Sequence, residues 1–119
     1  MKVILVNGSP HKEGCTYTAL KEVEKELIAA GVETELIWLG TQPVSGCLGC
    51  NGCCRRGPNG EAPTGLCVID DVVNEFIAKA KEADGFVFGS PVHYAALSGA
   101  LTSFMDRAFY GKGAIYRYK

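Results

Sequence analysis

Three cysteines are evenly spaced in the middle of the chain, in the run Cys47-Leu-Gly-Cys50-Asn-Gly-Cys53. Two intervening residues let neighbouring thiolates reach adjacent corners of one cubic centre, so a C-x2-C-x2-C run is typical of iron–sulfur ligands. Zinc held by the same thiolates is one alternative, and free thiols in a loop that only packs over another group are a second. The spacing therefore predicts a metal or redox role and leaves these interpretations open.

A second candidate site is the loop Asn7 to Gly14, which follows an apolar run and precedes an amphipathic stretch. Backbone N–H groups and the helix dipole at such a strand-to-helix turn bind anions. The loop lacks Gly-Lys-Ser/Thr, G-x-G-x-x-G and Cys-x5-Arg, which argues against nucleoside triphosphates, dinucleotides and phosphatase chemistry. Its hydroxyls at Ser9 and Thr16, with His11 nearby, suit a phosphate monoester that is held rather than cleaved. The alternative is a turn that any parallel α/β protein needs.

The role to expect for the six cysteines depends on the cellular compartment of the protein. Only four apolar residues separate Lys2 from Asn7, and no run of about twenty apolar residues occurs, so we expect neither a secretory signal nor a membrane span. We therefore expect a cytoplasmic protein, where structural disulfides are disfavoured and metal or redox roles come first. Cys15 stands apart from the others and is expected to be a small residue at a helix start.

Local patterns predict the elements that must position these residues, in the order β-α-β-loop-α-β-α. Right-handed crossovers then give a parallel α/β sheet with both strand-end loops on one rim, where a planar ligand with a phosphate tail would be gripped at both ends. The predicted elements are a strand at Val3–Val6, a helix at Thr16–Ala30 with Leu20, Val23, Leu27 and Ile28 facing the core and Gly31 as C-cap, an edge strand at Val32–Leu39, a helix from the N-cap Asp70 to about Ala83, a strand at Gly85–Ser90, a loop at Pro91–Leu97, and a helix from Gly99 capped by Ser98.

One segment interrupts this order. Residues 40–66 contain seven glycines, three prolines and four of the six cysteines, and show neither helical nor strand periodicity. Compact domains rarely keep so long a loop without a use. We therefore expect a single domain over residues 1–119, with a Cys/Gly-rich loop inserted at 40–67. The net charge of −1 provides no basic field, so nucleic acid is not an expected partner.

Three stretches are distinctive in combination: Gly8-Ser9-Pro10-His11-Lys12-Glu13-Gly14-Cys15-Thr16, Ser90-Pro91-Val92-His93-Tyr94, and Gly99-Ala100-Leu101 through Met105-Asp106-Arg107. Together they resemble the NADPH-dependent FMN reductase family of flavodoxin-like proteins, in particular its iron–sulfur flavoprotein branch. The resemblance implies a flavodoxin-like parallel sheet with helices on both faces. It also implies that the FMN phosphate is bound at Ser9, His11, Cys15 and Thr16, and that the isoalloxazine packs along Pro91, Val92, His93 and Tyr94.

Two positions of the phosphate loop depart from the family. The family commonly has Arg where His11 stands and Asn where Cys15 stands, so one permanent charge and one side-chain amide are absent. We expect FMN to bind on backbone donors. His93 is either a proton carrier beside the ring or a half-exposed residue of the rim.

The resemblance also implies a fourth ligand for a [4Fe–4S] cluster. In the family this ligand follows after about five residues, whereas Cys67 lies beyond an extra segment, Gly57 to Thr64. The longer loop costs roughly 0.8 kcal/mol more to close, which is small beside roughly 10 kcal/mol for metal–thiolate binding. Cys54 is adjacent to Cys53 and poorly placed to share its centre. The expected metal ligands are Cys47, Cys50, Cys53 and Cys67.

The resemblance implies an FMN-dependent oxidoreductase with a small-molecule electron donor and acceptor. NAD(P)H would deliver hydride to the flavin, and electrons would pass on, through the cluster if present, to a small acceptor or carrier. Two alternatives stay open: a non-enzymatic flavodoxin-like electron carrier, and a metal-binding or fragment domain without activity.

The last residues, Gly111 to Lys119, stand where the family begins its fourth strand. A flavodoxin-like sheet has strand order 2-1-3-4-5, so this chain is expected to form only 2-1-3, with its third strand at an open edge. Such an edge pairs readily with other strands. We therefore expect either a fragment of a longer reductase or a homo-oligomer.

Overall fold

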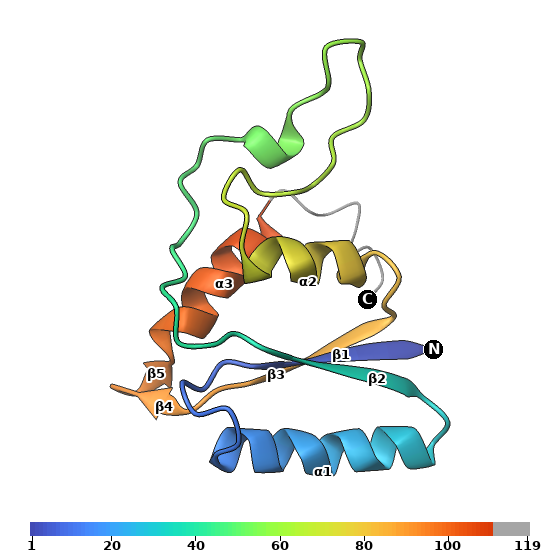
Figure 1. The fold of residues 1–119 in the computed structure, drawn as a ribbon, viewed down its shortest axis with the longest axis vertical. Coiled ribbons are helices and arrows are strands. Elements are labelled where there is room, and N and C mark those ends of the chain that lie inside the picture. Colours follow the sequence, from blue (N-terminus) through green and yellow to red (C-terminus); the bar gives the residue numbers. More distant parts are fainter. Residues whose placement is uncertain (111–119) are drawn as a thin grey trace.

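The structure of the protein is a computed structural model that describes residues 1–110. The predicted start of a fourth strand lies outside these residues. The elements follow the expected order, and two short strands are added near the end (Figure 1). They are β1 (Lys2–Asn7), α1 (Cys15–Ala29), β2 (Glu33–Trp38), the 3-10 helix η1 (Gly52–Cys54), α2 (Val72–Ala80), β3 (Gly85–Gly89), β4 (Val92–His93), β5 (Ala96–Leu97) and α3 (Gly99–Phe109).

The main sheet is parallel, with strand order β2-β1-β3. Helix α1 covers one face, and α2 and α3 cover the other (Figure 1). The central strand β1 is therefore buried on both sides, which explains its apolar run without alternation. The flavodoxin-like α/β fold and the edge position of β2 are confirmed. In the described part of the chain, β3 pairs only with β1, so its other edge is open.

The core between the sheet and the α2–α3 layer is largely aliphatic and contains a cluster of phenylalanine rings. Phe76 of α2 and Phe104 of α3 are fully buried, and their ring centroids lie 5.0 Å apart in an edge-on arrangement. Phe88 of β3 packs beneath them, 6.3 Å from the Phe76 ring. Such pairs add to the stabilisation that burial alone provides. This layer therefore fixes α2 and α3 relative to the strand ends that they follow.

The predicted inward face of α1 is wrong at two positions. Val23 is 41% exposed and Ile28 is 58% exposed, whereas Leu20 and Glu24 are buried. The rotation of the helix is set by close packing at the end of β3, because a Cβ at Gly89 would lie only 2.9 Å from Leu20 Cδ1. Glu24 follows Leu20 by one turn and therefore faces the sheet, where its carboxylate accepts a hydrogen bond from Thr34 Oγ1 (3.2 Å).

The boundaries of α2 also differ from the prediction. Asp71, not Asp70, is the N-cap, because its Oδ1 accepts a hydrogen bond from the Val73 N–H (3.1 Å). The helix ends at Ala80, before the predicted end near Ala83. Both aspartates satisfy the sequence rule for an N-cap, and the ion pair of Asp71 with Arg107 of α3 decides between them.

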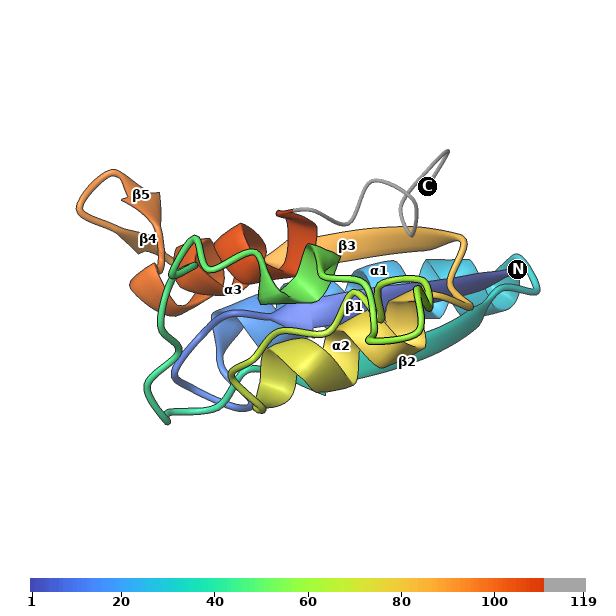
Figure 2. The ribbon, with the colours of Figure 1, turned by 90° about the horizontal axis from the view of Figure 1, so that it is seen from above.

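Two loops lie beyond the sheet. The Cys/Gly-rich loop is irregular apart from η1, as expected, and rises above α2 and α3 (Figure 1). The segment predicted as a loop at Pro91–Leu97 is instead the β4–β5 hairpin, which projects from the end of the molecule near the start of α3 (Figure 2). Its turn residues Tyr94 and Ala95 have φ values of 47° and 59°. A type I′ turn requires this conformation, but Tyr-Ala lacks the usual Asn-Gly signal.

Candidate functional site

The loop after β1 is held in shape by its own side chains. Buried Asn7 accepts a hydrogen bond from the Ser9 N–H through Oδ1 (3.0 Å) and donates one from Nδ2 to the Lys12 carbonyl (3.1 Å). Ser9 Oγ in turn accepts from the His11 N–H (3.1 Å). Trp38, at the end of β2, donates from Nε1 to the Ser9 carbonyl (2.9 Å). The loop is therefore preorganised by the ends of two neighbouring strands.

The N-terminus of α1 differs from those of the other two α-helices. Asp71 caps α2, and Ser98 caps α3 by accepting from the Leu101 N–H (3.3 Å). Within the described residues, α1 follows Gly14, has no side-chain cap and has no acidic residue in its first turn. The first-turn N–H groups of a helix lack intrahelical acceptors. Those of α1 are therefore suited to an anionic ligand.

Ser98 joins the first loop to the β4–β5 hairpin. Its Oγ donates to the Gly8 carbonyl (2.8 Å), and its N–H donates to Ser90 Oγ (2.9 Å). The Gly8 N–H donates to the Gly89 carbonyl (2.9 Å), which ties the ends of β1 and β3 together. The two loops that the sequence places on one rim are thus in direct contact.

A shallow hollow opens at this rim. His93 of the hairpin lines it, and the other lining residues come from the first loop, the segment after β2 and the start of α3: Gly8, Pro10, Gly40, Thr41, Gln42, Ser98, Gly99 and Ala100. Residues 40–42 were not predicted to contribute. The structure thus places His93 beside the first loop, as expected for residues that share one ligand.

The other predicted FMN contacts are distributed around this hollow. Ser9 is buried within the loop, His11 and Cys15 are exposed, and Thr16 is partly buried at the start of α1. Pro91 is partly buried, whereas Val92 and Tyr94 are exposed on the projecting hairpin. Tyr94 is fully exposed at its tip, so stacking on a flavin stays a prediction for this side chain.

The cysteine site is built around a second cavity. All four predicted metal ligands line it, although Cys67 is separated from the other three in sequence. Cys54 is not among its lining residues in the described part of the chain, and its thiol lies 3.7 Å from that of Cys53. The cavity is lined by Cys47, Leu48, Cys50, Asn51, Cys53, Cys67, Val68, Arg107 and Tyr110.

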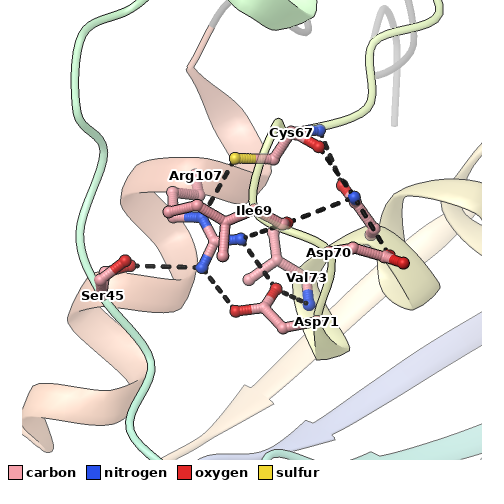
Figure 3. A network of polar contacts seen from close by, with 8 residues as sticks. Ser45, Cys67, Ile69, Asp70, Asp71, Val73 and Arg107 are labelled. Carbon is pink, nitrogen blue, oxygen red and sulfur yellow. Dashed lines mark hydrogen bonds and ion pairs between the residues drawn. The ribbon is translucent and has the colours of Figure 1, made fainter.

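Arg107 connects this cavity to the core (Figure 3). Its guanidinium forms a bidentate pair with Asp71, with both N···O distances at 2.7 Å. Its Nε donates to Cys67 Sγ (3.3 Å). The hydrogen bonds that the guanidinium donates to Asp71, and to a lesser extent to Cys67, raise the pKa of Arg107 despite the opposing effect of burial. The side chain is therefore a permanent buried cation.

The residues around this cavity are of the type that binds an iron–sulfur cluster, but in the described part of the chain they do not lie close enough together to bind one. Thiolates are the ligands of such clusters, and four of them surround one cavity. Within residues 1–110, however, no three His, Cys, Asp or Glu side chains come close enough to hold a metal ion. None of the six cysteines forms a disulfide. The thiols must therefore move together before they can share a centre.

Comparison with known protein families matches residues 1–119 to NADPH-dependent FMN reductase. The chain belongs to this family. The parallel sheet with helices on both faces (Figure 1) agrees with the flavodoxin-like fold expected of this family. No helix among the described residues is long and apolar enough to cross a membrane.

Several curated proteins similar to this FMN reductase family member are named iron–sulfur flavoproteins. The chain is 40% identical over 108 residues to one from Methanocaldococcus jannaschii, covering 91% of this chain and 52% of the relative. It is 32% identical to one from Methanosarcina thermophila (91% and 52% covered) and 29% identical to one from Archaeoglobus fulgidus (100% and 54% covered). The chain thus spans about half the length of these relatives.

Sequence reasoning missed the roles of two residues, Ser98 at the rim and Arg107 at the cysteine cavity. Ser98 was expected only to cap α3, yet it also bonds both rim loops. Arg107 was part of a family motif without a role of its own. A signal for it was present, because it lies three residues after Phe104 on the inward stripe of α3, where a charged residue needs a buried partner.

Proposed function

We propose that this protein binds FMN at the rim formed by the ends of β1 and β3 and acts as a flavin-dependent oxidoreductase. The observation that carries this proposal is the uncapped N-terminus of α1 beside a preorganised loop, in a member of the FMN reductase family. The α1 N–H groups and the hydroxyls of Ser9 and Thr16 would hold the phosphate. The hollow beside His93 would hold the rest of the ligand.

The electron donor in this proposal is NAD(P)H, and the acceptor is a small molecule or an electron carrier. FMN, when bound, supplies the hydride and single-electron chemistry. The protein contributes binding and orientation. The bond from Ser98 to the Gly8 carbonyl keeps the two loops at a fixed separation, which is what a ligand gripped at both ends requires.

We also propose that Cys47, Cys50, Cys53 and Cys67 hold a [4Fe–4S] cluster. Support comes from their common cavity and from the names of the curated relatives. Closing the thiols around a cluster would rearrange the loop, and the binding free energy of a metal–thiolate centre is large enough to offset that cost.

Protein purified without air tests both parts. We expect the absorption bands of bound FMN, a broad thiolate-to-iron band, and about four irons and four sulfides per chain. Stopped-flow mixing with NADPH under argon should bleach the flavin. A flavin that binds but stays oxidised would instead support an electron carrier. Absence of FMN binding would contradict the proposed function, and zinc without iron would contradict the cluster.

A further inference from the structure

Arg107 has an acceptor for each of its five N–H donors. Nε donates to Cys67 Sγ, one terminal nitrogen donates to Asp71 and to the Ser45 carbonyl (3.4 Å), and the other donates to Asp71 and to the Ile69 carbonyl (2.9 Å). Only 1% of the side chain is exposed. A buried guanidinium with all donors satisfied is held in one orientation (Figure 3).

These acceptors lie at both ends of the cysteine loop. Ser45 precedes Cys47, and Cys67 and Ile69 follow the rest of the loop. One side chain from α3 therefore fixes the start and the finish of the segment that carries all four proposed ligands. Asp71 balances the charge of the guanidinium and, as the N-cap of α2, is itself anchored to a core helix.

The contact with sulfur is the unusual one. Four of the five donors meet oxygen atoms, whereas Nε meets the thiol of Cys67, the proposed ligand most distant in sequence. Hydrogen bonds to cluster sulfurs are among the factors that set reduction potential, and partners outside the ligand shell orient the ligands. A donor already placed on Cys67 can serve both roles.

We propose that Arg107 is the positioning residue for Cys67, holding its sulfur toward the shared cavity and remaining hydrogen-bonded to it when it is a cluster ligand. This inference rests on the proposed cluster. A bound cluster would supply one-electron chemistry, and its reduced form, with the electron coming from the NAD(P)H-reduced flavin, would carry one more negative charge. The fixed N–H donor of Arg107 would stabilise that added charge and so raise the cluster's potential.

The test is Arg107→Lys in the whole chain, prepared without air, because lysine keeps the charge and loses the Nε donor and the planar fork. The matched control is Arg55→Lys, an exposed position in the same loop. Iron and sulfide content and the cluster's midpoint potential are measured. We expect Arg107→Lys to shift the potential negative, by about tenfold in the reduction equilibrium or about 59 mV for one electron. Arg55→Lys should match the wild type.

Arg107→Lys with normal iron content and an unchanged potential would overturn the role of Arg107 alone. Wild-type protein without iron would overturn the proposed cluster and this inference with it. Should the variant fail to fold, pulsed EPR of the reduced wild-type protein labelled with 15N-arginine replaces it. A 15N coupling to the cluster supports the assignment, and its absence contradicts it.

Discussion

At the residue scale, the proposed phosphate site depends on few side chains. Thr16 lies in the first turn of α1, and its methyl group faces the end of β3, because a Cβ at Gly89 would meet Thr16 Cγ2 at 2.8 Å. The methyl group therefore packs against the strand, while the hydroxyl is the part suited to an anion. This separation lets the two parts be tested independently.

We expect Thr16→Val to weaken FMN binding by about 1–3 kcal/mol, because it keeps the shape and removes a hydrogen bond to a charged group. Thr16→Ser should retain most of the affinity, and Thr18→Val, at an exposed position of the same helix, serves as a control. Fluorescence titration with FMN measures all three. Equal affinity of Thr16→Val and the wild type would remove Thr16 from the site.

The cysteines provide the second prediction at this scale. Serine at Cys47, Cys50, Cys53 or Cys67 should abolish the proposed cluster, because each thiol lines the common cavity. Cys54→Ser should keep it, since Cys54 is exposed outside that lining. Iron and sulfide assays on the five variants decide the matter. Loss with Cys54→Ser together with retention in Cys67→Ser would reverse the choice of fourth ligand.

At the scale of elements, the rim depends on a close approach between the end of β1 and the start of α3. A Cβ added at Gly8 would lie 2.8 Å from Leu101 Cβ and 3.2 Å from the Gly89 carbonyl oxygen. Neither neighbour can yield easily, because Leu101 is buried and Gly89 is backbone in the sheet. Only glycine lets the loop reach Ser98 without displacing α3.

Gly8→Ala should therefore destabilise the fold by about 1–3 kcal/mol, as overpacking generally does, and should weaken FMN binding as well. Gly99→Ala is the matched control for stability alone, because nothing lies within 4 Å of a Cβ at that position and alanine favours the helix, whereas Gly99 also lines the hollow proposed for FMN. Urea unfolding compares them. If Gly8→Ala is as stable as the wild type, α3 can move to accommodate the added methyl group, and the close approach is not required.

At the scale of the whole molecule, one side of the sheet is only partly covered. A groove runs between α1 and β3, lined by Thr16, Ala19, Leu20, Val23, Val87, Phe88, Gly89 and Ser90. It lies beside the edge of β3 that is open in the described residues. Apolar surface next to an open strand edge favours association.

We propose that two copies of this chain associate through this groove and edge. Light scattering should give twice the mass of 12.7 kDa for the wild-type chain, whereas Val23→Lys should shift it toward the monomer. Ile28→Lys is the control, because Ile28 is exposed on the same helix but does not line the groove. A stable wild-type monomer that binds FMN tightly would contradict the proposal.

The sequence by itself determined the order of the six main elements and indicated the residues of both candidate sites. Apolar runs, helical periodicity and turn residues are local properties, so β1, α1, β2, α2, β3 and α3 were predictable with only small errors at their ends. The spacing of Cys47, Cys50 and Cys53 is likewise local, since it specifies which thiols can reach one centre whatever the surroundings.

Tertiary structure decided what depends on contacts between distant residues. Close packing against Gly89 turned α1, so that Glu24 is buried and Val23 is exposed. Asp70 and Asp71 are equally good candidates for the N-cap of α2 from the sequence alone. Asp71 is the N-cap in the structure because it pairs with Arg107, which lies 36 residues away. The bond from Arg107 to Cys67 spans 40 residues. No local pattern encodes such a contact, because it exists only once α3 packs beside the cysteine loop.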